Sequence, residues 1–146
     1  MKRILIALCA FSIPFTASVS PTEATNLPCP QYHKLMHQNG LPVKEMAWIM
    51  HRESKCVARA VGWNYYPGKD HTDCRSGEFK KHRRCKAVKS YDLGLMQINY
   101  ATWDDLTTKL CGKKSTTLLR PSCNLKVAGE IYRQYGLAPW KGNSNG

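Results

Sequence analysis

The sequence predicts a small, mostly α-helical domain that is stabilised by disulfides and interrupted by one long irregular segment. Two stretches, 42–54 and 122–135, repeat apolar residues at the three- and four-residue spacing of a helical face. Residues 61–89 show no such periodicity and contain three glycines and eight basic residues. At 146 residues the chain has room for a single domain.

The first 24 residues are typical of an export signal. Two basic residues precede the short apolar run 4–15, and small residues allow cleavage after Ser18 or Ala24. The apolar run is shorter than the ~20 residues that span a bilayer, so we do not expect a membrane helix. We predict a signal peptide over 1–24 and a secreted or periplasmic mature domain over 25–146.

Cleavage of this signal removes Cys9 and leaves six cysteines. An even number in a small exported chain predicts three disulfides. Six cysteines allow fifteen pairings, and the sequence alone does not choose among them. We predict the sequential pairing Cys29–Cys56, Cys74–Cys85 and Cys111–Cys123.

The chain is strongly basic, with a formal net charge of +12. After cleavage at Ala24 it carries 20 basic and 9 acidic residues, a net charge of +11. Such a charge attracts polyanions, which include bacterial walls, anionic lipid surfaces and nucleic acid. Export favours the first two over nucleic acid.

The N-terminal half is expected to contain two helices and then a loop. A helix over 31–39 is closed by Gly40, and Pro42 suits the first turn of a second helix that reaches about Cys56. Segment 61–89 is expected to be a long loop or a short hairpin pinned by its two cysteines. Long loops in compact domains are often functional.

The C-terminal half is expected to contain two more helices. Thr102 is the expected N-cap of a helix that ends at Gly112. The last helix is predicted over about 122–135, with Gly136 at its end.

Glu53 is the most informative single residue. The apolar stripe of the second helix includes Met46, and at 100° per residue Glu53 lies within about 20° of it. We expect a carboxylate there to be desolvated and able to hold a proton near neutral pH, as a general acid must. The alternative is a partly buried glutamate with a salt-bridge partner.

Three motifs follow one another along the chain. Glu53-Ser54 is followed by 92–99, which reads Asp-Leu-Gly-Leu-Met-Gln-Ile-Asn, and then by Asn124-Leu125 with Gly129. In this order they resemble the lysozyme-like superfamily, which contains c-type lysozymes and the bacterial and phage lytic transglycosylases. The resemblance covers about residues 29–140 and implies an α+β, mostly α-helical, lysozyme-like fold. Nothing in the sequence requires a cofactor or a metal, and we expect a monomer.

The resemblance also implies roles for two carboxylates. Glu53 matches the general acid that protonates the glycosidic oxygen, and Asp92 matches the second carboxylate of c-type lysozymes. Glycosidases of this kind pair an acid with an ionised carboxylate, and lysozyme is the type case. The alternative for Asp92 is a turn residue that hydrogen-bonds its own backbone.

Further residues are candidates for substrate binding. Gln97 and Asn99 match positions that line the sugar cleft, or they are strand residues that satisfy backbone groups. Tyr91 and Met96 are also predicted to bind substrate. Trp103 is a second aromatic residue that could stack on sugar rings, although core packing is the default for tryptophan and tyrosine.

The implied substrate is peptidoglycan, cleaved at the β-1,4 bond between N-acetylmuramic acid and N-acetylglucosamine. The bacterial form of the 94–99 motif favours a lytic transglycosylase, which leaves a 1,6-anhydro end. The alternatives are a hydrolytic muramidase that uses Glu53 and Asp92, and a non-catalytic cationic protein that binds walls or membranes. Gly94 follows Glu53 by 41 residues, which is longer than usual in the superfamily.

The surplus segment 61–89 has two interpretations of its own. His71-x-x-Cys74 and His82-x-x-Cys85 have a spacing that could close a tetrahedral zinc site, although exported cysteines usually oxidise. Its eight basic residues are a solvated face, or they hold the protein on anionic wall polymers.

Overall fold

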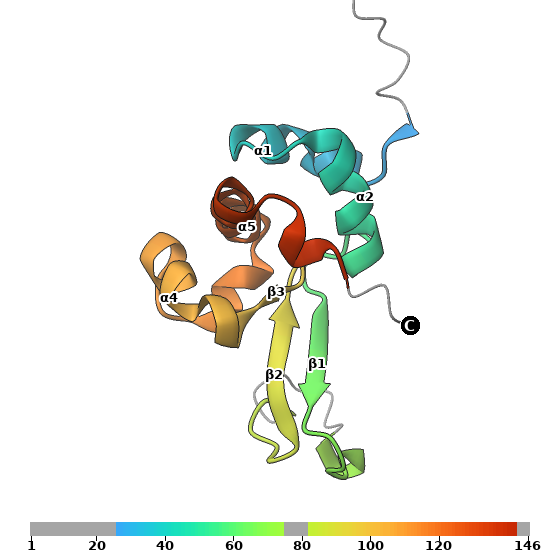
Figure 1. The fold of residues 1–146 in the computed structure, drawn as a ribbon, viewed down its shortest axis with the longest axis vertical. Coiled ribbons are helices and arrows are strands. Elements are labelled where there is room, and N and C mark those ends of the chain that lie inside the picture. Colours follow the sequence, from blue (N-terminus) through green and yellow to red (C-terminus); the bar gives the residue numbers. More distant parts are fainter. Residues whose placement is uncertain (1–25, 75–81, 143–146) are drawn as a thin grey trace, which may run out of the picture.

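The computed structural model describes residues 26–74 and 82–142. The predicted signal peptide lies outside these residues. A helical body carries a β-hairpin, which projects from it as an arm (Figure 1). The predicted α+β, mostly α-helical fold class is confirmed.

The N-terminal helices follow the sequence expectation closely. The 3-10 turn η2 (Pro30–Tyr32) leads into α1 (His33–Gln38), and α2 spans Val43–Ser54. Pro42 is the N-cap of α2 rather than a residue of its first turn. Met36 from α1 and Met46 and Met50 from α2 are completely buried, which confirms the predicted apolar face.

Segment 61–89 opens and closes with strands. β1 (Val61–Tyr65) pairs antiparallel with β2 (Val88–Leu93), and β2 pairs with β3 (Ile98–Asn99) in a sheet of order β1-β2-β3. Of the two predicted forms, the hairpin is correct, and the described residues between its two strands include the 3-10 turn η3 (Thr72–Cys74). No periodicity was visible because these strands are short and mostly half-buried.

The C-terminal elements are α4 (Tyr100–Cys111), η4 (Ser115–Leu119), α5 (Pro121–Tyr135) and η5 (Ala138–Trp140). The predicted N-cap of α4 is wrong. Asn99 is the cap, because its side chain accepts a hydrogen bond from the Thr102 backbone N–H. The chain thus passes directly from β3 into the helix, and Trp103 has non-helical dihedrals (φ −119°, ψ 24°).

Helix α5 supplies much of the core. Leu125, Val127, Ala128 and Ile131 are at most 1% exposed and pack with the methionines of α1 and α2. Gly129 faces α1 so closely that a Cβ there would overlap the Asn39 carbonyl oxygen. The glycine of the third motif is therefore a packing requirement.

The three predicted disulfides are present. They join Cys29 to Cys56, Cys74 to Cys85 and Cys111 to Cys123. The zinc interpretation of the hairpin is wrong, because its two sulfurs are bonded to each other. The two imidazoles stack on aromatic rings instead, His71 on Tyr65 and His82 on Trp63. Among the described residues, we find no helix with the length and apolar character to cross a membrane.

Candidate active site

Glu53 lies in the last turn of α2. The helix ends because Lys55 and Cys56 adopt left-handed conformations, with φ of 53° and 64°. The Lys55 N–H still bonds the His51 carbonyl. Ser54 is buried and its hydroxyl donates to the Met50 carbonyl at 3.1 Å. The Glu-Ser pair therefore combines a carboxylate that lines the cleft with a buried serine that bonds the backbone of its own helix.

The surroundings of Glu53 are less apolar than the helical pattern predicts. Its side chain is 26% exposed, and Oε1 accepts hydrogen bonds from Arg52 Nη2 at 2.6 Å and Nε at 3.0 Å. Arg52 Nη2 also donates to the Trp140 carbonyl oxygen. The negative end of the helix dipole lies here and favours a cation. The salt-bridge alternative is thus the correct description of this side chain.

Asp92 lies in β2, so its interpretation as a turn residue is wrong. Its two oxygens accept from two side-chain amides, Oδ1 from Asn99 at 2.7 Å and Oδ2 from Asn64 at 2.9 Å. Both amide nitrogens also contact Ser90 Oγ at 3.1 Å. These donors fit an ionised carboxylate, which can only accept.

The sheet register explains how this network forms. Asn64 lies opposite Ser90, and Asp92 lies opposite Asn99. Alternate residues of a strand point to the same face, so Ser90 and Asp92 share one side of the sheet with their cross-strand amides. Three strands therefore fix one carboxylate.

Gln97 is held in the turn between β2 and β3. Its φ is 45°, and its Nε2 donates to the carbonyls of Gly94 at 2.9 Å and Ala60 at 3.3 Å. A Cβ on Gly62 would lie 2.7 Å from Gln97 Oε1, so the missing side chain of this glycine makes room for the amide.

One cleft of about 350 Å³ brings these groups together. It is lined by Glu53, Asp92, Gln97, Ile98, Asn99, Trp103, Ile131, Pro139, Trp140 and Gly142. The cleft thus includes both predicted carboxylates and both predicted amides. The lining residues come from α2, the sheet, α4, α5 and the C-terminal turn, which Figure 1 shows meeting where the hairpin joins the helical body.

Two predicted substrate-binding residues lie elsewhere. Met96 is completely buried, with its N–H bonded to Asn124 Oδ1 and its carbonyl to Trp140 Nε1. Tyr91 precedes Asp92 in β2 and therefore points to the opposite face, where it stacks on Tyr100. Neither side chain lines the cleft.

The sequence interpretation missed three residues at this site. Asn64 was placed in an aperiodic segment, and only the strand register shows that it reaches Asp92. Arg52 precedes Glu53 and carried no signal of its own. Trp140 is 7% exposed and packs in the core, and it also lines the cleft, where its carbonyl oxygen accepts a hydrogen bond from Arg52.

In the part of the chain that the structure describes, no group that could hold a metal ion includes Glu53 or Asp92. Within the described residues, Cys29, His51 and Cys56 are the group near enough together to share an ion. Both sulfurs belong to a disulfide, so they are not available as thiolate ligands.

Comparison with known proteins identifies a family. Residues 31–136 match the family model described as the transglycosylase SLT domain. The matched region includes α2, the whole sheet and α5, and thus the residues that carry Glu53 and Asp92. Searches of curated proteins and of solved structures return no significant match.

Proposed function

We propose that this chain, which belongs to the transglycosylase SLT domain family, is a lytic transglycosylase. It would cleave the β-1,4 bond between N-acetylmuramic acid and N-acetylglucosamine in peptidoglycan, with Glu53 as its acid and base. The observation that carries this proposal is the cleft that Glu53 shares with Asp92, Gln97 and Asn99. A carboxyl group at the wall of a polar cleft is suited to proton transfer to a bound sugar.

Glu53 would act in two steps. As a neutral acid it gives its proton to the glycosidic oxygen, and the C1–O4 bond breaks. The resulting carboxylate then takes the proton of the muramic acid 6-hydroxyl as that oxygen bonds C1, which closes the 1,6-anhydro ring and restores the acid. Among the described residues, only Oε1 has hydrogen-bond partners, which leaves Oε2 to carry the proton.

A hydrolytic muramidase is the second candidate, and the support for it is the network around Asp92. A retaining glycosidase uses a second carboxylate to meet positive charge at the anomeric carbon, before water completes the reaction. Asp92 is held by amides from two neighbouring strands in the same cleft as Glu53. Such fixed acceptors are what electrostatic stabilisation requires.

The setting of the reaction is outside the cytoplasm. Three disulfides support this location, since they persist in oxidising compartments. The predicted signal peptide agrees with it, and the basic charge suits a protein that works on an anionic wall as a monomer.

The test is mass spectrometry of the muropeptides released from purified peptidoglycan by the oxidised protein. Glu53→Gln should lower the rate by at least about 100-fold, because the amide cannot transfer a proton. Asp105→Asn removes an exposed carboxylate outside the cleft and is the matched control.

The products and the effect of Asp92→Asn separate the alternatives. Anhydro ends with little loss in Asp92→Asn support the transglycosylase. Reducing ends that disappear in Asp92→Asn support the muramidase. A folded wild-type protein that releases neither product would contradict both and favour non-catalytic wall or membrane binding.

A further inference from the structure

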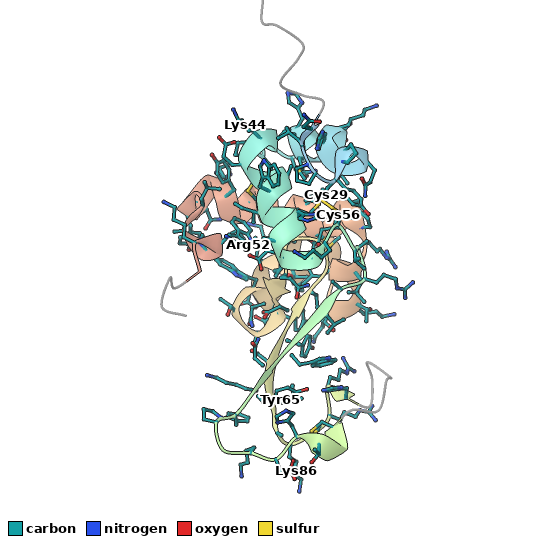
Figure 2. All side chains as sticks on the ribbon, turned by 90° about the vertical axis from the view of Figure 1, so that its right-hand side faces the viewer. Cys29, Lys44, Arg52, Cys56, Tyr65 and Lys86 are labelled. Atoms are coloured by element: carbon teal, nitrogen blue, oxygen red, sulfur yellow. A yellow bond between two sulfur atoms is a disulfide. The ribbon has the colours of Figure 1, made fainter. Side chains whose placement is uncertain are left out.

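Arg52 lies beside the cleft, where it bonds two of the lining residues, Glu53 and Trp140, and among the described residues two of its five N–H donors are unused. Its Nε and Nη2 groups bond Glu53 Oε1 and the Trp140 carbonyl. A guanidinium has five N–H donors, and within the described residues no partner is found for the two on Nη1. The side chain is 55% exposed. Figure 2 shows Arg52 at the end of α2 that is nearer to the hairpin, opposite to Lys44.

The geometry of the Arg52–Glu53 pair is poor for a guanidinium. Both donors converge on a single carboxylate oxygen, whereas the preferred arrangement uses two parallel bonds to two oxygens. A second pair on α5 shows that arrangement: Arg133 Nε bonds Glu130 Oε2 at 3.1 Å and Nη2 bonds Oε1 at 2.5 Å. Arg52 would therefore form stronger hydrogen bonds with a carboxylate that accepted from it through both oxygens.

The proposed reaction requires the Arg52–Glu53 pair to separate. Glu53 can give a proton only as a neutral acid, and a neutral acid forms no ion pair. The pair joins partly exposed side chains, and ion pairs of this kind contribute little to stability. Replacement of Glu53 by another anion as the partner of Arg52 therefore costs little free energy.

The substrate offers such an anion. Peptides attached to muramic acid carry free carboxylates beside the glycan that would lie in the cleft. We propose that Arg52 binds a peptide carboxylate of the substrate in place of Glu53, so that this enzyme selects peptide-bearing glycan and frees its acid in the same event. This inference rests on the proposed function, because it assumes that Glu53 is the acid.

The experiment compares native peptidoglycan with the same material after its carboxylates are amidated by carbodiimide and methylamine. Glycan structure and peptide length stay the same, and each carboxylate becomes an uncharged N-methylamide. A charge-assisted hydrogen-bonded pair predicts that the wild type cleaves the native form about tenfold faster at low substrate concentration. The cationic protein also loses general attraction to the amidated form, so variants must isolate the part played by Arg52.

Arg52→Gln should lose most of this discrimination, whereas Arg133→Gln should retain it. The second variant removes the same charge from a similar ion pair that does not line the cleft. Arg52→Lys should keep part of the discrimination, because lysine keeps the charge without the fork. On amidated peptidoglycan Arg52→Gln should be faster than the wild type, since nothing then holds Glu53. A purely structural role for Arg52 predicts a slower variant on both substrates.

Each outcome bears on one proposal. A wild type that cleaves neither substrate overturns the proposed function. A wild type that cleaves both equally fast overturns the role of Arg52 and leaves the function intact, and this comparison needs no variant to fold. Equal discrimination by Arg52→Gln and Arg133→Gln also overturns it.

Discussion

Asn124 should be the most important single polar side chain for stability. It is completely buried in α5 and forms three hydrogen bonds to the backbone. Nδ2 donates to the carbonyls of Leu93 at 2.8 Å and Leu118 at 2.9 Å, and Oδ1 accepts from the Met96 N–H at 2.9 Å. One amide thus ties the end of β2, the turn before β3 and the 3-10 turn η4 to the core helix.

Asn124→Ala would leave these three backbone groups buried without partners. Each such group costs about 1–3 kcal/mol, so we expect a loss of roughly 3–9 kcal/mol. That is a large share of the ~5–15 kcal/mol of a typical domain. Asn39→Ala is the matched control, because the half-buried Asn39 makes a single such bond, from Nδ2 to the Leu35 carbonyl at 2.8 Å.

The assay is urea unfolding of the oxidised protein, followed by tryptophan fluorescence and by circular dichroism. Coincident transitions would justify a two-state free energy. Asn39→Ala should lose about 1 kcal/mol, a typical value for one hydrogen bond. If Asn124→Ala lost no more than this control, the idea that its amide organises the turn beside the cleft would be refuted.

Two further changes test the packing and the hairpin. Gly129→Ala should lower the free energy of unfolding by about 1–3 kcal/mol, because the new Cβ overlaps the Asn39 carbonyl oxygen. Thermal unfolding would measure this loss. An unchanged melting temperature would show that the backbone at Asn39 shifts without cost. Replacing Cys74 and Cys85 by serine opens a link between residues 11 apart and should cost at most about 3 kcal/mol. The activity of the folded double variant should stay within about twofold of the wild-type activity, since this disulfide does not line the cleft. A larger loss of activity would show that the hairpin tip acts in catalysis.

The helices were predictable because their signals are local, whereas the cysteine count predicted the number of disulfides and did not fix their pairing. The bounds of α2 and α5 follow from apolar spacing, from proline at the start and from glycine or left-handed residues at the end. The sheet was harder, because its strands are short and half-buried and the residues of β1 gain their meaning only from their partners in β2. Asn64 illustrates this: in sequence it is one polar residue in an irregular segment, and in space it holds Asp92.

The sequence by itself determined that this is a disulfide-stabilised domain of the lysozyme-like superfamily, with a carboxylate at the end of a buried helical stripe. Only the tertiary structure decided what surrounds that carboxylate. Helical periodicity predicts the face on which Glu53 lies, but it does not predict how its partner Arg52 is held. Arg52 also bonds the carbonyl oxygen of Trp140, which lies 88 residues further along the chain. The same holds for Met96, which the motif places beside the cleft and the packing buries completely. Side-chain environment is set by contacts between distant segments, and a local pattern does not contain them.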